Sequence, residues 1–277
     1  IHKRYHKGIA KLIDNSKISS SPTSQDLGFI VGPQINAASR IDDSSLASKL
    51  LISNDIEQVE SISRKLFLLN EKRKLIESQI LDDANNQAAN QSSSNFILVF
   101  GNNWHQGVLG IIASKIKDIY YKPTIVISFS NNIGVGSARS IENVDLGKII
   151  LNAKTENFLI SGGGHSMAAG LKINFSNLEN FKNYLEKSLS LYPKNLFDRI
   201  DYFDSVITPN ELNLDLINGI EQLQPFGKGN PEPVFILKDV NIDSIKIIKN
   251  KHILIFFEND KGDKIKGICF NSNKTIL

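Results

Sequence analysis

The chain has 277 residues, of which 41% are hydrophobic and 22% charged, and its formal net charge is +3. This composition excludes a disordered or fibrous chain, and the length predicts two or three globular units. The single cysteine, Cys269, excludes an internal disulfide framework and is typical of a reducing compartment, which predicts a cytoplasmic protein.

The first predicted element is a basic helix within residues 1–17, which carry five Lys or Arg side chains and one carboxylate. We favour a solvated helix face over a nucleic-acid contact for this charge. The Ser- and Pro-rich stretch "NSKISSSPTSQD" predicts a loop. Gly32-Pro33 then punctuates the chain, and helical spacing resumes beyond Asp42 through Leu46 and Leu50.

Residues 55–90 predict one long amphipathic helix. Their apolar side chains recur at steps of three, four and seven, and the segment contains neither Gly nor Pro. A helix of about 36 residues is about 54 Å long, which exceeds a small domain, so we expect it to connect two domains. Its polar tail, "NNQAANQSSS", predicts a linker.

Short strands alternate with helices in the next part of the chain, which favours a mixed α/β layer. Continuous or alternating apolar runs predict the strands, and amphipathic runs predict the helices. We expect strands at 96–100, 124–129, 134–140 and 171–175, and helices at 106–120, 146–154 and 177–192, the last ended by Pro193.

The last part of the chain is rich in short alternating runs. The segment "ENDKGDK" predicts a hairpin turn between the strands "HILIFF" and "KIKGICF". We expect a partial, OB-like β-barrel, because the chain ends before such a barrel would close. The fold class is therefore α/β and multidomain.

Five motifs occur in order along the chain: "GPQINAASRIDD" (32–43), "WHQGVLGIIASKIKDIYYKPTIVIS" (104–128), "GSARS" (136–140), "GGGHSMAAG" (162–170) and "QPFGKGNPEPVF" (224–235). In sequence and spacing they resemble the bacterial RecJ family of single-strand-specific exonucleases. The resemblance covers nearly the whole chain, and five ordered motifs are far more specific than one glycine-rich loop.

The resemblance implies a domain order. Residues 1–54 would be the C-terminal end of a DHH domain, 55–94 a connecting helix and linker, 95–193 a DHH-associated domain (DHHA1), and 194–277 a truncated OB-like domain. It also implies hydrolysis of single-stranded DNA in the 5′ to 3′ direction, with two divalent ions, manganese or magnesium, activating a water.

The chain departs from the family at the metal-binding core. It contains no Asp-His-His and no Asp-x-Asp, and its five histidines, at 2, 6, 105, 165 and 252, are scattered. We therefore expect the ions to be held by a DHH domain outside this chain. By itself the chain is predicted to bind single-stranded DNA weakly and not to cleave it.

The glycine run before His165 implies a close approach or an unusual backbone dihedral, because glycine is costly to order. A turn formed by Gly162, Gly163 and Gly164 would let N–H groups converge on an anion, and a protonated His165 would donate to a phosphate oxygen. The alternative is a structural turn in which His165 bonds a carbonyl. The resemblance favours the phosphate contact and makes His165 the candidate catalytic residue.

Ser137 and Arg139 are two apart on an extended segment, so their side chains point to the same side and suit one phosphate. The resemblance implies that they hold the 5′-terminal phosphate of the DNA. The alternative is an exposed arginine at a strand end.

Arg40 is a candidate contact for the DNA backbone, and an ion pair with Asp42 or Asp43 is the alternative. Relatives more often have glycine where this chain has Ser39. If that position required a positive φ, Ser39 would be strained.

Three further residues are candidate substrate contacts. His105 would line a cleft at a strand-to-helix junction, whereas the neighbouring Trp104 is better explained as a core residue. Phe226 and Lys228 would stack a base and attract the backbone in the OB-like domain. The alternative for Phe226 is a plug in the barrel or the domain seam.

Two other functions remain open. One is a related phosphodiesterase acting on short RNA or nucleoside bisphosphates, and the other is a non-catalytic nucleic-acid-binding scaffold. Alanyl-tRNA synthetases share the associated domain but are disfavoured by the first and last motifs. The predicted partners are single-stranded DNA and a single-strand binding protein, and no membrane contact is expected because no apolar run approaches about 18 residues.

Overall fold

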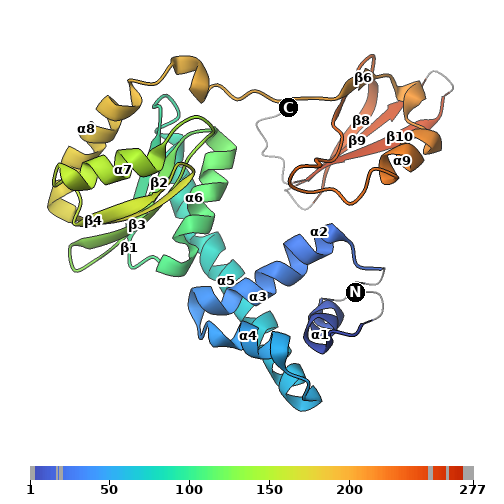
Figure 1. Cartoon of the computed structure of the whole chain (residues 1–277). Helices are drawn as coiled ribbons and strands as arrows, with labels where there is room; N and C mark the ends of the chain where they lie inside the picture. Colours follow the sequence, from blue (N-terminus) through green and yellow to red (C-terminus); the bar gives the residue numbers. More distant parts are fainter. Residues whose placement is uncertain (1–3, 17, 19–20, 249–251, 260–261, 271–277) are drawn as a thin grey trace. The chain divides into compact units, whose positions relative to one another are not determined.

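The computed structural model describes residues 4–16, 18, 21–248, 252–259 and 262–270 (Figure 1). The chain divides into two compact units, the first comprising residues 1–22 and 26–199, and the second residues 23–25 and 200–277. The mixed α/β character predicted from the sequence is confirmed.

The first part of unit 1 is helical. Leu12, Leu50 and Leu66 are fully buried in the core that these helices share. Gly32-Pro33 starts α3 without a break in the helical path, because a π-helical turn leads directly into it and Pro33 lies in the first turn of α3. The elements of this part are α1 (Lys7–Asn15), the π turn (Leu27–Val31), α3 (Gly32–Ile41), α4 (Ser45–Ile52) and α5 (Ile56–Ala89). The short helix α2 (Ser24–Asp26) comes before the π turn, and its first two residues are assigned to unit 2.

Helix α5 confirms the long helix predicted from the apolar spacing. Asp55 caps its start, accepting from the backbone N–H groups of Glu57 and Gln58. Residues 85–89 of its polar tail are helical, and the role of the tail as a linker stays a prediction. The side chains of Gln87 and Gln91 each exchange two hydrogen bonds with the strand β1 (Ile97–Asn102), at Phe100 and Leu98 respectively.

The second part of unit 1 is built on a five-stranded sheet with strand order β1-β2-β3-β5-β4. Only β1 and β2 are parallel, and the other pairs are antiparallel. The predicted strands and helices of this part are confirmed, with shifts of a few residues at their ends. The further elements are β2 (Thr124–Ser130), β3 (Ile133–Arg139), β4 (Ser161–His165), β5 (Ala168–Asn174), α6 (Gln106–Tyr120), α7 (Leu146–Thr155) and α8 (Leu178–Leu189).

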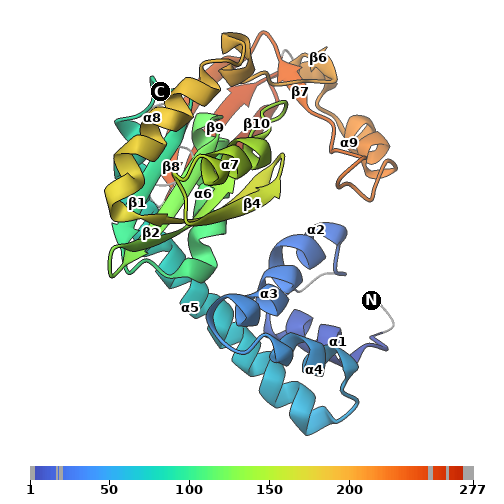
Figure 2. The ribbon, with the colours of Figure 1, turned by 60° about the vertical axis from the view of Figure 1, so that its left-hand side comes forward.

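The two faces of this sheet are covered by different helices (Figure 2). Ile125 and Ile127 of β2 belong to the core that α7 and α8 complete. Val126, on the opposite face, packs with α6 and the second half of α5. Because α6 lies over β2 and β3, the side of β5 and β4 that faces α6 carries exposed residues such as Gly170 and His165.

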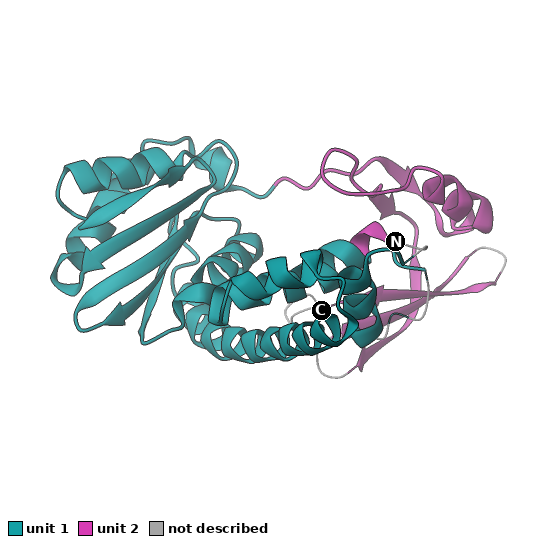
Figure 3. Cartoon of the chain, turned by 60° about the horizontal axis from the view of Figure 1, so that its bottom comes forward, with its two compact units in different colours: residues 1–22, 26–199 teal, residues 23–25, 200–277 magenta. Residues whose placement is uncertain are grey.

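Unit 2 holds two separate small sheets, coloured magenta in Figure 3. The predicted hairpin is confirmed, because β9 and β10 pair antiparallel and Asn259 bonds Asp263 across the turn. Within the described residues the strands form open sheets and not a closed barrel. The elements are β6 (Ser205–Ile207), α9 (Leu214–Glu221), β7 (Phe235–Leu237), β8 (Asn241–Ile248), β9 (His252–Glu258) and β10 (Lys264–Cys269). None of the helices in the described ranges has the length and apolar character needed to cross a bilayer.

Candidate phosphate-binding site

The first turns of α6 carry two glycines where other parts of unit 1 approach closely. A Cβ atom at Gly107 would lie 1.9 Å from the carbonyl oxygen of Arg40, and one at Gly110 would lie 2.8 Å from Nη2 of Arg139 and 3.2 Å from Oγ of Ser137. Glycine at both positions therefore lets α3 and β3 bring these three side chains to one face of α6.

Ser137 and Arg139 point to the same side of β3, as their spacing predicts. The guanidinium of Arg139 donates to Oγ of Ser137 at 3.2 Å and to the carbonyl of Ala138 at 2.8 Å. Arg139 is half-buried between β3 and α6, so it is not an exposed arginine at a strand end. Its guanidinium is held in place by neutral groups.

Arg40 reaches the same glycine face from α3, where its Nη1 donates to the carbonyl of Gly107 at 3.1 Å. The ion pairs proposed as the alternative are not formed. Asp42 binds Lys65 at 3.1 Å, and Asp43 accepts from the hydroxyl of Ser45 at 2.7 Å.

The expected strain at Ser39 is absent. Ser39 lies within α3 and is not among the described residues with a positive φ, and its hydroxyl donates to the carbonyl of Asn36 at 2.9 Å. The position therefore needs no glycine in this chain.

The two guanidinium groups influence each other. Burial lowers the pKa of Arg139, and the neighbouring charge of Arg40 lowers it further. Burial also lowers the pKa of Arg40, as does Arg73, while Glu77 raises it. Both arginines keep their charge, because arginine is not deprotonated in proteins. Two like charges in a partly desolvated site attract an anion strongly.

His165 belongs to the same face of the sheet. The pairing register aligns Arg139 of β3 with Ala168 of β5, and Ala168 with His165 of β4. Paired residues share a face, and two strand spacings place the Cα atoms of Arg139 and His165 about 10 Å apart. Ala168 lies between Arg139 and His165, and the adjacent row on the same face consists of Ser137, Gly170 and Gly163. These four positions have small side chains or none, so they form a small-residue floor between and beside Arg139 and His165.

The three glycines before His165 form a strand and not a turn, so the predicted nest of N–H groups is wrong. None of them has a positive φ. A Cβ atom at Gly162 would lie 2.8 Å from Cγ2 of Ile150, and one at Gly164 would lie 2.3 Å from the carbonyl oxygen of Ala168. Gly163 faces the opposite side and has open space. Gly162 and Gly164 thus permit close packing against neighbouring residues, and Gly163 adds no side chain to the small-residue floor.

The turn after β4 is fixed by α7 and the end of β3. Leu146 donates its N–H to the carbonyl of Ser166 at 3.1 Å, and Ser140 donates to that of Met167 at 3.0 Å. A Cβ atom at Gly147 would lie 2.7 Å from the carbonyl carbon of His165. The backbone of His165 is therefore held closely, while its side chain is exposed.

Comparison with known proteins covers both units. The family model of the DHHA1 domain matches residues 93–191, and that of the RecJ OB domain matches residues 203–277. The single-stranded-DNA-specific exonuclease RecJ of Haemophilus influenzae is 33% identical over 265 residues, which are 92% of this chain and 46% of that protein. The chain belongs to the RecJ family.

Other members are similar over the same extent. The RecJ exonuclease of Bacillus subtilis is 29% identical over 91% of this chain and 34% of that protein. The crystal structure of RecJ in complex with Mn²⁺ from Thermus thermophilus has the same fold, with a TM-score of 0.81 and 23% identity over 99% of this chain and 40% of that one. This RecJ-family chain spans less than half the length of these relatives.

His105 caps α6, which was not anticipated. Its Nδ1 accepts the N–H of Gly107 at 3.2 Å, which leaves Nε2 as the ring nitrogen not used by the cap. Trp104 is a core residue, as preferred, because its indole packs over Gly101 in the α5 and α6 core. His105 therefore supports the glycine face of this RecJ-family chain through the helix start.

The candidate residues of unit 2 are in a different part of the fold from Arg40, Ser137, Arg139 and His165. Phe226 is half-buried and Lys228 is exposed. The loop that carries them is shaped by Asn230, whose side-chain amide donates to the carbonyls of Leu223 at 2.9 Å and Pro225 at 3.0 Å. Phe226 is not a fully buried plug, and its stacking role stays a prediction.

A polar cluster on α5 was not predicted from the sequence. Asn70, Arg73 and Glu77 lie in the stripe of α5 that is otherwise buried and mostly apolar, and Lys115 of α6 binds Glu77. The interruption of the apolar spacing at these three positions was the available signal.

Metal ligands are not assembled here. Among the residues that the structure describes, no group of three or more His, Cys, Asp or Glu side chains is placed to hold an ion. The described residues therefore do not fit the divalent ions that the resemblance implies.

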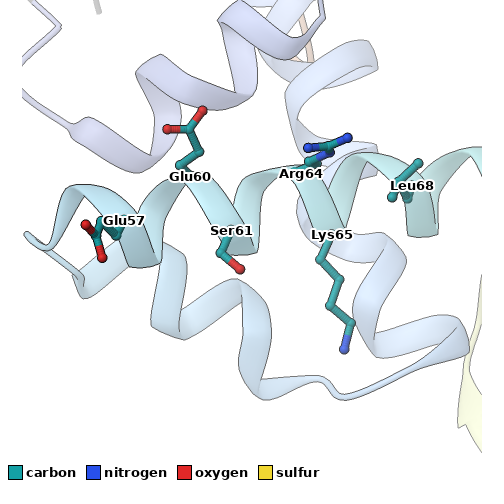
Figure 4. A pocket seen from close by; sticks show the side chains of 6 residues that line it. All are labelled: Glu57, Glu60, Ser61, Arg64, Lys65 and Leu68. Atoms are coloured by element: carbon teal, nitrogen blue, oxygen red, sulfur yellow. The ribbon is translucent and has the colours of Figure 1, made fainter.

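A shallow depression of about 570 Å³ lies along the exposed face of α5 (Figure 4). Two of its charged residues have internal partners, since Glu60 binds Lys11 at 2.8 Å and Lys65 binds Asp42 at 3.1 Å. It therefore lacks the uncompensated charge of the arginine site. Its lining residues are Glu57, Glu60, Ser61, Arg64, Lys65 and Leu68.

Proposed function

We propose that this chain is the substrate-binding part of a metal-dependent exonuclease that hydrolyses single-stranded DNA from the 5′ end. Arg40, Ser137 and Arg139 hold the 5′-terminal phosphate, and His165 faces the scissile phosphate. The observation that carries the proposal is the meeting of two guanidinium groups and one hydroxyl on the glycine face of α6.

The geometry suits a terminal phosphate better than an internal one. A terminal phosphate carries more negative charge and three free oxygens, and planar guanidinium groups bind such oxygens in pairs. From there the DNA strand would run over the small-residue floor, past Gly170 and Gly163, toward His165. His165 would donate to a phosphate oxygen when protonated.

Divalent ions would supply the activated water and stabilise the leaving oxygen, and a part of the enzyme outside this chain would hold them. We therefore expect the 277-residue chain to bind DNA without cleaving it. Metal-dependent release of nucleotides by the purified chain, absent from a preparation without it, would contradict this expectation.

The deciding experiment is fluorescence anisotropy at low salt with one oligonucleotide carrying either a 5′-phosphate or a 5′-hydroxyl. The wild-type chain should bind the phosphate form more tightly by at least about tenfold, since charge-assisted hydrogen bonds to the phosphate contribute about 1.5–3 kcal/mol. Arg139→Ala should abolish the difference, while Arg64→Ala, an exposed arginine outside the site, should retain it. Equal binding of both forms by the wild-type chain would contradict a 5′-phosphate site at Arg40, Ser137 and Arg139.

We also propose a cytoplasmic location and a single-strand binding protein as a partner. The single cysteine, which is exposed, supports the location because reducing compartments keep thiols free. Co-purification of the chain with a single-strand binding protein would test the partner.

A further inference from the structure

Helix α5, which packs against α3 and α6, carries a buried ionic cluster. The side chain of Glu77 is 6% exposed, and its Oε2 accepts from Nη1 of Arg73 at 2.6 Å. Its Oε1 lies 2.5 Å from Nζ of Lys115 on α6. Asn70 fixes Arg73 from the other side, accepting from its Nε at 3.2 Å. One carboxylate therefore binds two cations from two helices.

Stability alone does not explain this cluster. Glu77 lies in a stripe where Leu66, Ile80 and Ala84 are buried, and buried ion pairs are often no more stabilising than apolar residues of similar size. The charges of Arg73 and Glu77 therefore indicate a role in arranging the cations of the site.

The cations of this region fall into two classes by partner. Arg73 and Lys115 bind the carboxylate of Glu77. Arg40 and Arg139, in contrast, donate to neutral oxygens among the described residues, those of Gly107, Ser137 and Ala138. Arg40 lies on α3, which packs against both α5 and α6, the two helices that carry the cluster. Consistent with this packing, the charge of Arg73 lowers the pKa of Arg40 and that of Glu77 raises it.

We propose that Glu77 is a positioning residue that withholds Arg73 and Lys115 from the DNA, so that the terminal phosphate meets Arg40 and Arg139 alone. This inference rests on the proposed function. A lysine without an internal partner binds any phosphate of the backbone as a point charge. If the charge of Glu77 were removed, Arg73 and Lys115 would be free to bind phosphates anywhere along the DNA strand. The affinity of the chain for DNA would then rise, and its preference for a 5′-phosphate would fall.

The test is Glu77→Gln, which keeps the size of the side chain and removes its charge. Anisotropy with 5′-phosphate and 5′-hydroxyl oligonucleotides over a salt series should show at least about threefold tighter binding of the hydroxyl form and a weaker 5′ preference. The salt dependence should steepen by about 0.7 for each freed cation. Uniform weakening of both forms, or an unchanged slope and preference, would overturn the inference, because a merely structural role predicts no steeper slope.

Lys115→Gln keeps the inference testable if Glu77→Gln folds poorly, because the Lys115 side chain is half exposed. In the wild-type background it should leave the salt slope unchanged, since Glu77 already occupies the lysine. In the Glu77→Gln background it should lower the slope by about 0.7. Lys117→Gln, which removes an α6 lysine paired with Asp118, is the matched control and should change neither slope. A lower slope for Lys115→Gln in the wild-type background would show that Lys115 contacts phosphate and would overturn the inference.

The two proposals fail differently. A wild-type chain without any preference for the 5′-phosphate overturns the proposed function and this inference with it. A wild-type preference that Glu77→Gln leaves unchanged, with an unchanged salt slope, overturns this inference alone.

Discussion

Two glycines of α6 have opposite expected responses to an added methyl group. At Gly110 the new Cβ would meet the end of the Arg139 side chain, which is able to move, whereas at Gly107 it would meet the backbone of Arg40 at 1.9 Å. Gly110→Ala should therefore displace Arg139 and abolish the 5′-phosphate preference without lowering the melting temperature, because Ala favours a helix by about 1 kcal/mol over Gly.

Gly107→Ala should instead lower the melting temperature, because the backbones of α3 and α6 must separate. Thermal unfolding followed by circular dichroism, together with the anisotropy assay, distinguishes the two variants. A Gly110→Ala chain that is as destabilised as Gly107→Ala would show that the contact at Gly110 is rigid, contrary to this expectation.

At the scale of elements, the C-terminal end of α5 and the turn after it cover one edge of the sheet with side chains. Gln91 exchanges two hydrogen bonds with Leu98, and Gln87 does the same with Phe100, so the two amides substitute for a neighbouring strand. Gln91→Ala should lower the free energy of unfolding by about 1–3 kcal/mol, since two hydrogen bonds are lost. Amide exchange at Leu98 should also accelerate.

Gln79→Ala is the matched control for this prediction, because Gln79 is an exposed glutamine on α5, the helix that leads to Gln91. It should leave both the unfolding free energy and the exchange at Leu98 within error of the wild type. If Gln91→Ala behaves like this control, water replaces the side-chain amide of Gln91 without loss of unfolding free energy. The β1 edge of the sheet then does not depend on this glutamine.

The elements that the sequence predicted well are those with a strong local period. The apolar spacing predicted α5, and alternation predicted β5, because each pattern reports directly on a buried face. The glycine strand β4 was mistaken for a turn, since glycines have no side chains to alternate and the strand is defined by pairing with β5. The bonds from Gln91 to β1 escaped prediction because they depend on tertiary packing.

The candidate site shows the same division. The two-residue spacing of Ser137 and Arg139 predicted a shared side, which the structure confirms. The approach of Arg40 depends on how α3 packs against α6, 67 residues further along the chain, and no local pattern encodes that. Arg73 and Glu77 were not singled out from the sequence, although their place in the apolar stripe was visible.

At the scale of the whole molecule, the two units should contribute separately to DNA binding. The arginine site lies entirely in unit 1, whereas Phe226 and Lys228 lie in unit 2. Phe226→Ala should weaken binding of a long single strand by about 1–3 kcal/mol through lost stacking, and Lys228→Ala should reduce the salt slope by about 0.7.

Both unit 2 variants should weaken the 5′-phosphate and 5′-hydroxyl oligonucleotides equally, because neither residue reads the end of the strand. Arg139→Ala should instead weaken binding of the 5′-phosphate oligonucleotide alone and leave binding of the 5′-hydroxyl oligonucleotide unchanged. Adding Phe226→Ala to Arg139→Ala should then give the sum of the two losses, as expected for independent sites without shared partners. A loss of 5′ preference in Phe226→Ala alone would instead mean that unit 2 takes part in recognising the strand end.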